Sequence, residues 1–522
     1  MQSKKCRSLL LRLENVSLKF NLKMIALSSL ILTKWLILPI ILIFLTTYWM
    51  KLKFSYWKKR KVPHFKPSFP FGNVNIFNGT PSIGQIYNDF YKKAKAHGFK
   101  YAGYYMSIEP VFVAIDPECI KQLLIKDFPS FHARGFYHNE KDQPMSANIF
   151  TIDGPKWRTL RYKFSPTFTS GKIKYMYQLV LNCEKQLSEM ISKHAKTKMP
   201  INIKDIISRY TTDTISSCAF GVDTNSFGEN PVIHQNVTTC IEKSTTFLRF
   251  GCLYVLPNVC RFFKVGLFVG NYLKYFEDLI MDTFEQRKKN LVYRTDFLQM
   301  MKEMQDQKIP EFDVTLEEIK SQAFIFFLGG FETSSTAMTF LFLELAENPE
   351  IQEKLRNEIN EVSEKHGGIT FEALQEMKYL SCVVDETLRM YPPATVLNRR
   401  CTEDYTLPNG EILEKDTNII IPNFAIQRDP EYYPNPEMFD PDRFTEENKA
   451  KRPPYTYLPF GDGPRNCIGS RFGLIQIKVA VSHLVKKFKF SVNKNMDTTR
   501  DYSSHFVLTL KRDVILDVEE VS

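Results

Sequence analysis

The sequence predicts one large, mainly helical domain that follows a single membrane-spanning segment near the amino terminus. No Gly/Ser-rich linker, charge block or internal repeat interrupts residues 63–522, which favours one folded unit. With 43% hydrophobic and 13% aromatic residues, the 522-residue chain can bury the core of a domain of roughly 450 residues. The membrane segment is predicted from a long apolar run, residues 24–50, between basic flanks.

The positive charge of the chain is concentrated at its amino end. The net charge is +11, but residues 1–61 hold thirteen Lys/Arg and one acidic residue, so the remaining 461 residues are nearly neutral. A basic segment around an apolar run is typical of membrane attachment, whereas nucleic-acid binding needs a basic folded surface. We therefore expect membrane lipid, and no nucleic acid, as a partner.

The amino-terminal region divides into three predicted parts. Residues 1–23 are a basic extension, which the protein lacks if Met24 is the true start. Residues 24–50 are predicted to be a signal anchor that spans the membrane once, because six cations in the next eleven residues act as a stop-transfer block. A cleaved signal peptide is the alternative, but no small-residue cleavage site follows the run. Residues 51–72 form a basic, proline-rich hinge, and residues 73–522 form the folded domain.

A long apolar helix is predicted for residues 316–346. Thr315 and Glu318 have the spacing of a capping box at its start, and Asn348–Pro349 ends it. Two consecutive glycines at positions 329 and 330 lie near its middle, where they remove side chains and permit a local kink. The helix therefore has one place at which another group can approach its backbone.

Two polar residues, Glu332 and Thr333, follow these glycines. A threonine within a helix commonly bonds a carbonyl of its own helix. Alternatively, its hydroxyl and the adjacent carboxylate face a reaction site and relay protons. The residues themselves leave both interpretations open.

Two further motifs have helical spacing. Residues 379–390 are predicted to form an amphipathic helix on which Glu386 and Arg389 share one face, although such a pair is usually a solvated surface pair. Trp157 and Arg161 lie one helical turn apart and are both side-chain hydrogen-bond donors.

The segment 460–469, FGDGPRNCIG, holds Cys467 in a glycine-rich, cationic loop. The residues after Ile468 are predicted to form a helix, whose amino end favours a charged thiolate. A thiolate in such a loop is a candidate metal ligand, and a buried structural thiol is the alternative. The other nine cysteines lack metal-ligand or disulfide spacing.

The loop matches the pattern F-x-x-G-x-R-x-C-x-G and thereby resembles the haem-thiolate monooxygenases of the cytochrome P-450 superfamily. The stretches WRTLRYKFSPTFTSGKIKYM, GGFETSS and FGDGPRNCIG resemble the insect microsomal branch that contains the family-six enzymes. The resemblance extends over nearly the whole chain. It implies a mainly α fold with a small β-rich lobe toward the amino side, and a haem b cofactor between two long helices.

The resemblance also implies roles for individual residues. Cys467 would be the axial ligand of the haem iron, and Thr333 with Glu332 would deliver protons on the open side beside Gly330. Arg443, in Pro441-Asp442-Arg443-Phe444, would join Glu386 and Arg389 in a buried ionic cluster. The remaining residues expected around the cofactor are Trp157, Arg161, Arg399 (with Arg400 as a rival) and Arg465, which would bind its propionates, together with Phe460 and Gly469.

The implied activity is insertion of one atom of O₂ into lipophilic substrates, with electrons from NADPH delivered by NADPH-cytochrome P-450 reductase. Cytochrome b5 is a second candidate donor. Both would meet the domain on the cytosolic side of the endoplasmic reticulum membrane. The basic residues expected at the docking surface are Lys451, Arg452, Arg465, Arg471 and Lys478.

The substrate stays open between two classes. Detoxification of xenobiotics or insecticides is the preferred role, and oxidation of endogenous hormones, steroids or fatty acids is the alternative, because related enzymes divide between these tasks on loop residues. The lining expected for the pocket is rich in apolar residues, which favours a lipophilic substrate. A haem-binding sensor or electron carrier is a third class, but it would not require Gly330, Glu332 and Thr333.

Overall fold

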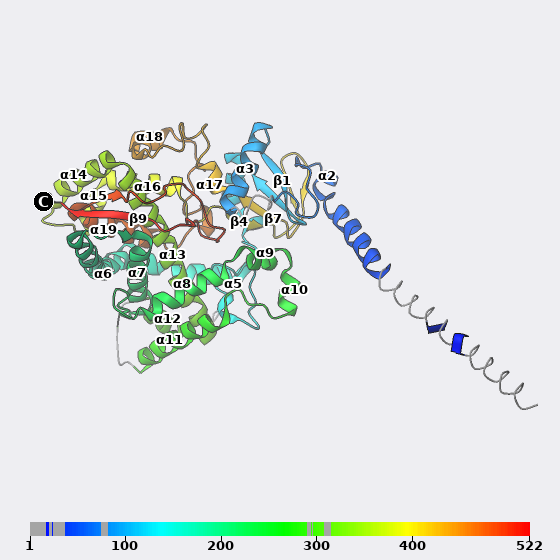
Figure 1. The fold of residues 1–522 in the computed structure, drawn as a ribbon, viewed down its shortest axis with the longest axis horizontal. Helices are drawn as coiled ribbons and strands as arrows, with labels where there is room; N and C mark the ends of the chain where they lie inside the picture. Colours follow the sequence, from blue (N-terminus) through cyan, green and yellow to red (C-terminus); the bar gives the residue numbers. More distant parts are fainter. Residues whose placement is uncertain are drawn as a thin grey trace, which may run out of the picture.

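The computed structural model describes residues 17–19, 23–24, 37–74, 82–289, 294, 296–306 and 315–521. The predicted extension and the first half of the predicted membrane segment lie largely outside these residues. Residues 37–53 are helical, and large apolar side chains such as Ile43 and Phe44 are exposed on them. This helix projects from the folded body (Figure 1).

One described helix, α13 (Leu316–Glu347), is long and apolar enough to cross a bilayer when judged by length and composition alone. In its most apolar window, however, 61% of the residues are buried inside the folded body. Thr315 and Glu318 form the predicted capping box at its start. It is therefore the core helix expected for residues 316–346, and the amino-terminal span remains a prediction.

The fold is mainly helical (Figure 1). The helices before α13 are α2 (Tyr56–Lys59), α3 (Ile83–Ala96), α4 (Pro117–Lys121), α5 (Gly154–Phe164), α6 (Ser170–Thr197), α7 (Ile203–Ile215), α8 (Val232–Ser244), α9 (Phe247–Val255), α10 (Pro257–Phe262), α11 (Gly270–Lys288) and α12 (Phe297–Asp306). Those after it are α14 (Pro349–Lys365), α15 (Phe371–Glu376), α16 (Lys378–Met390), α17 (Asn423–Ile426), α18 (Glu446–Lys451) and α19 (Ser470–Lys487).

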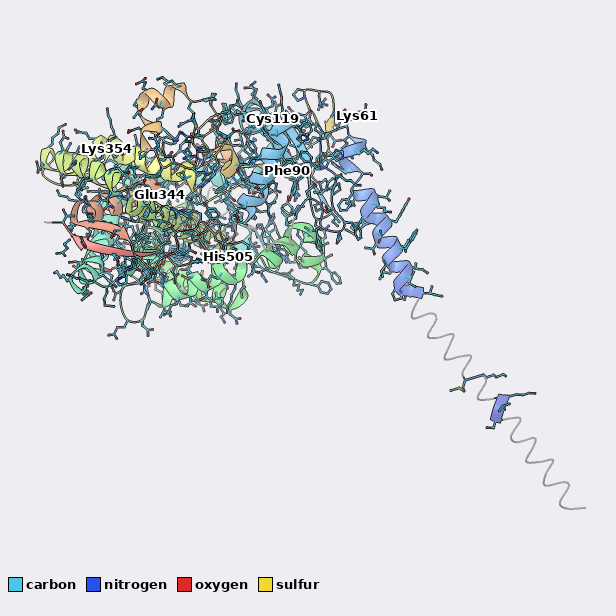
Figure 2. All side chains as sticks on the ribbon, turned by 45° about the horizontal axis from the view of Figure 1, so that its top comes forward. Lys61, Phe90, Cys119, Glu344, Lys354 and His505 are labelled. Carbon is cyan, nitrogen blue, oxygen red and sulfur yellow. The ribbon has the colours of Figure 1, made fainter. Side chains whose placement is uncertain are left out.

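The predicted β-rich lobe is present, but its sheet joins distant parts of the chain. Its strand order is β1 (Tyr101–Met106), β2 (Glu109–Ala114), β7 (Asn418–Ile421), β4 (Leu397–Arg400), in which only the β2–β7 pair is parallel. Smaller sheets are formed by β3 (Ile201–Asn202), β9 (Ile515–Glu520) and β8 (Phe488–Val492), and by β5 (Tyr405–Thr406) with β6 (Ile412–Leu413). Figure 2 shows Phe90 and Cys119 in the lobe with the large sheet and Glu344 in the helical part.

Part of the predicted hinge is packed on this sheet. Trp57 is fully buried, and its indole nitrogen donates to the carbonyl of Tyr104 at 3.1 Å. A Cβ on Gly103 would lie 2.3 Å from the Trp57 ring, so only glycine fits beneath it. The direction in which the amino-terminal helix leaves the body is therefore set by packing as well as by the prolines.

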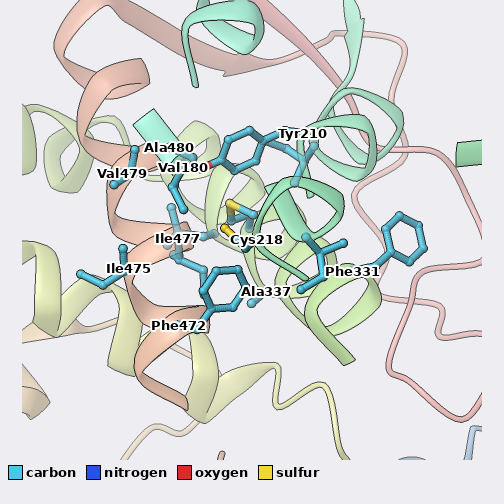
Figure 3. Close-up of a cluster of buried hydrophobic side chains, with 14 of the residues drawn as sticks. Val180, Tyr210, Cys218, Phe331, Ala337, Phe472, Ile475, Ile477, Val479 and Ala480 are labelled. Atoms are coloured by element: carbon cyan, nitrogen blue, oxygen red, sulfur yellow. The ribbon is translucent and has the colours of Figure 1, made fainter. Parts of the chain in front are cut away.

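The core that supports the site is built where α19 packs against α6, α7 and α13. Figure 3 shows Ile477 and Ala480 of α19 on the side of Val180 and Tyr210, and Phe472 of α19 beside Ala337 of α13. The Tyr210 hydroxyl donates to the carbonyl of Gln476 on α19 at 3.1 Å, which satisfies a phenol buried in apolar surroundings. This packing fixes α19, and with it the loop that precedes α19, relative to α13.

A buried ionic cluster connects α16 to the segment before the Cys467 loop. The Arg389 side chain donates to both carboxylate oxygens of Glu386, at 2.7 and 2.8 Å, and both side chains are completely buried. Arg389 also donates to the carbonyls of Gln427 and Pro436. The Arg443 Nε lies 3.5 Å from Glu386. Because every member has several partners, removal of one leaves the others buried without compensation.

We expect Glu386→Gln to lower the free energy of unfolding by about 3–5 kcal/mol, since Arg389 would keep its charge without a counterion. Urea denaturation of the purified protein measures this change. Asp442→Asn is the matched control, because Asp442 pairs with Lys354 at 2.9 Å on the surface and such pairs contribute less than about 1 kcal/mol. Equal stability of the two variants would contradict the structural role of the cluster.

Candidate functional site

A cavity of about 440 Å³ separates the Cys467 loop from α13. Its walls come from the segments around residues 134–151, 241–268, 325–337, 393–399 and 459–477, with Phe506 and Val507 from the carboxyl-terminal loop. All residues for which the sequence predicted a place beside the cofactor line this cavity: Trp157, Arg161, Gly330, Glu332, Thr333, Arg399, Phe460, Arg465, Cys467 and Gly469. Folding thus brings together motifs up to three hundred residues apart.

The Cys467 loop is bent tightly below the cavity. The Cys467 amide donates to the carbonyl of Phe460 at 2.8 Å, which closes the loop. Gly463 has a φ of +72°, and a Cβ there would lie 2.2 Å from the Leu124 carbonyl oxygen, so only glycine is accommodated. Helix α19 begins directly after the loop, at Ser470.

The Cys467 side chain is accessible from the cavity, while protein surrounds it on the other sides. Burial raises the pKa of its thiol, and the Gly469 amide together with Arg134 and Arg161 opposes that increase. In the protein alone, burial therefore outweighs these three favourable contacts. A metal ion bound to the sulfur would supply the missing stabilisation, because its positive charge favours the thiolate and the thiol releases its proton to solvent.

The opposite wall is the middle of α13. A Cβ on Gly329 would meet open space, whereas a Cβ on Gly330 would lie 2.5 Å from the Ile215 side chain of α7. Gly330 is therefore required by the close approach of α13 and α7, and Gly329 leaves the space above the cysteine open. Gly330 also lines the cavity, so its packing against α7 adds to the role that the sequence predicted for it.

Thr333 and Glu332 lie on this wall. The Thr333 hydroxyl donates to the Gly329 carbonyl at 2.6 Å, which is the ordinary bond of a helical threonine, and its oxygen remains able to accept. Burial raises the pKa of Glu332 to about 7, with Lys204 lowering and Glu242 raising it. Glu332 also lines a second cavity of about 70 Å³, so it lies between the main cavity and a smaller polar one.

Four arginines converge beside the Cys467 loop. The Arg161 guanidinium donates to the Asn466 carbonyl at 2.9 Å, and Arg134 donates to the Arg465 carbonyl at 2.9 Å. Arg399, on β4, keeps its buried Nε without a hydrogen-bond partner among the described residues. Burial and the neighbouring guanidiniums lower the pKa of Arg399 to about 9.

Arg465 is the most extensively bonded member of this arginine cluster. It donates to the carbonyls of His132 and Ile152 and to the Asp153 carboxylate, at 2.7–2.8 Å, and lies over the Trp157 ring. Burial, with repulsion from the other guanidiniums, lowers its pKa to about 8. Because guanidinium groups keep their proton in proteins, these lowered values express an excess of buried positive charge.

This excess fits a dianionic cofactor. Asp153 is the one carboxylate that favours the charged forms of Arg134, Arg399 and Arg465. Among the described residues that line the cavity, Glu332 on the far wall is the single carboxylate. A haem presents two carboxylates on one edge and an iron at its centre. Its carboxylates suit the unpartnered Arg399 donor, and its iron suits the Cys467 thiolate.

Two residues at this site were missed in the sequence. Arg134 and Asp153 belong to no spaced motif, and only the charge of Arg134 in an otherwise apolar stretch could have indicated it. The rival Arg400 donates to Asn418 and to the Gly135 carbonyl and does not line the cavity. Arg465 is almost completely buried, so its predicted place in a docking surface is wrong.

Comparisons with known proteins agree with this geometry. The family model described as "Cytochrome P450" matches residues 63–516. "Probable cytochrome P450 6a20" of Drosophila melanogaster is 39% identical over 93% of this chain and 99% of its own length, and "Cytochrome P450 6A1" of Musca domestica is 37% identical over 91% and 96%. "Cytochrome P450 6k1" of Blattella germanica is 38% identical over 84% and 87%. The chain therefore belongs to the cytochrome P450 family, the monooxygenases whose cofactor is a haem iron.

Proposed function

We propose that this cytochrome P450 inserts one atom of O₂ into neutral, lipophilic molecules bound in the cavity above Cys467. The observation that carries the proposal is the cavity itself, in which the Cys467 loop faces Glu332 and Thr333 and the arginine cluster lies beside the loop. A thiolate-ligated haem, when bound there, supplies an iron centre that activates oxygen. A sensor or carrier would not need the open wall opposite the cysteine.

In this proposal the residues have separate roles. Cys467 ligates the iron, and the guanidiniums of Arg134, Arg161 and Arg399 bind the carboxylates of the cofactor. Arg465 holds the loop to residues 132–153 and supports the Trp157 ring. Glu332 holds a proton near neutral pH and passes it to the Thr333 oxygen. The Thr333 hydroxyl then turns from the Gly329 carbonyl and releases its own proton to the cavity.

The absorption spectrum of the reduced, carbon monoxide-treated protein tests the ligand. We expect the strongly red-shifted Soret band of a thiolate complex, and its loss in Cys467→Ala. Cys218→Ala is the matched control, because Cys218 also lines the cavity. An intact thiolate band in Cys467→Ala would show that another cysteine ligates the iron.

Proton delivery predicts a pH dependence. Because the pKa of Glu332 is raised to about 7, its carboxyl keeps a proton below that pH and loses it above. We expect product formed per NADPH to fall, and peroxide to rise, as the pH increases through 7. Thr333→Ala should lower product formation by on the order of 100-fold.

In Glu332→Gln, product formed per NADPH should no longer change as the pH increases through 7, because glutamine does not titrate. Thr339→Ala is the control for Thr333, since Thr339 makes the same bond to its own helix, to the Ser335 carbonyl at 2.8 Å, away from the main cavity. If Thr333→Ala formed as much product per NADPH as the parent protein, Thr333 would be excluded from proton delivery.

The cavity composition supports a neutral, apolar substrate. Four phenylalanines from separate segments meet in it: Phe136 stacks on Phe150 at 4.9 Å between ring centroids, and Phe506 contacts both and also Phe250. Such a surface binds apolar and aromatic molecules. We infer xenobiotic metabolism, including insecticides, as the preferred role because the relatives are insect family-six enzymes, with endogenous hormones, steroids or fatty acids as the alternative.

We also propose that residues 24–50 anchor the protein in the endoplasmic reticulum membrane with the domain 73–522 in the cytosol. The exposed apolar helix of residues 37–53 supports this, as do Phe262 and Phe263, whose rings are among the most exposed apolar side chains. Deletion of residues 1–50 should release the protein from salt-washed membranes, as measured by sedimentation. Retention of the truncated protein on membranes would exclude residues 24–50 as the sole anchor.

NADPH-cytochrome P450 reductase is the proposed electron donor, with cytochrome b5 as a second donor. Arg471 is exposed at the start of α19, directly after the Cys467 loop, and supports docking there. Lys451 is also exposed but pairs with Glu447 at 2.6 Å. Lys478 instead donates to Ser381 at 2.7 Å and is half-buried. NADPH consumption by the purified protein that began only on addition of the reductase would support this partner, and consumption without it would exclude the requirement.

A further inference from the structure

The carboxylate of Asp153 lies within the arginine cluster, although its position in the chain suggests another task. Asp153 directly precedes α5, where an aspartate normally caps the helix, yet its side chain makes no capping bond. Its Oδ1 accepts from the Arg465 side chain at 2.7 Å and from the Arg134 amide at 2.9 Å. The acidic side chain is therefore committed to the arginines.

Formal charges show why a carboxylate is needed there. The guanidiniums of Arg134, Arg161, Arg399 and Arg465 contribute four positive charges beside one cavity. In the reduced state, in which a haem core is neutral, the Cys467 thiolate and the two carboxylates of the haem would offset three of them. Asp153 supplies the fourth negative charge, and the side chain is only 27% exposed, so water screens it incompletely.

We propose that Asp153 is a positioning residue that acts as the internal counterion of the arginine cluster, and that its charge keeps the reduction potential of the bound haem low. The inference rests on the proposed haem site and adds a function for a residue that touches neither the iron ligand nor the substrate. Reduction adds one electron to the haem, and a nearby negative charge makes that addition less favourable.

The same charge affects how tightly the cofactor is held. Asp153 reduces the net positive charge of the arginine cluster, and that charge attracts the haem carboxylates. Neutralising Asp153 should therefore strengthen retention of the cofactor. A residue that merely fastened Arg465 in place would have the opposite effect on retention.

Asp153→Asn tests the charge by itself, because an asparagine keeps the oxygen that accepts from Arg465 and Arg134. We expect a midpoint potential of the holoenzyme that is more positive than in the parent protein, measured by dithionite titration in the presence of mediators. We also expect slower transfer of haem to apomyoglobin. Asp153→Glu, which restores the charge, should return the potential toward the parent value.

Asp142→Asn is the matched control, since Asp142 lies in the same connection before α5 and contacts Lys264 at 3.8 Å away from the arginines. If Asp153→Asn does not accumulate, Asp153→Ser serves in its place, because serine offers a helix-capping oxygen without charge. An unchanged potential, whatever the rate of haem transfer, overturns the proposal. Failure of the parent protein to give a thiolate spectrum would instead overturn the proposed function.

Discussion

The packing of α13 against α7 and α19 is the constraint on which the site depends. Gly330 lets α13 approach Ile215 of α7 closely, and the contacts of α19 hold the Cys467 loop at a set distance from the α13 wall. The cavity is the space left between these packed surfaces, because Gly329 presents no side chain that could fill it. Close-packed interiors deform little, so the opening persists.

A second constraint is the electrostatic repulsion within the arginine cluster. Burying several guanidiniums side by side is unfavourable unless anions accompany them, and among the described residues Asp153 is the one carboxylate that stabilises them. The site therefore keeps an uncompensated positive charge until a cofactor with carboxylates binds. The Glu386–Arg389 pair differs, since its charges are matched within the protein and bonded to backbone carbonyls. The arginine cluster is therefore suited to binding an anionic cofactor, and the Glu386–Arg389 pair is suited to holding the surrounding segments rigid.

The polar groups on α13 have a different environment. Glu332 separates the main cavity from a smaller one lined by Lys204, Glu242 and His505, and burial brings its pKa near neutrality. A carboxyl in that range can hold and release a proton under physiological conditions. The aromatic rings that meet above the Cys467 loop carry no such groups, which separates substrate binding from proton transfer within one cavity.

Local signals in the sequence determined much of this protein. The capping box at Thr315 and Glu318, the helical spacing of Trp157 and Arg161, and the glycine-rich Cys467 loop each depend on neighbours within a few residues, so they could be predicted from the residues themselves. Only the tertiary structure decided that Asp153 and Arg134 belong to the site, that Arg465 is buried, and that Gly330 serves helix packing. These facts depend on contacts between segments far apart in the chain, which local spacing does not encode.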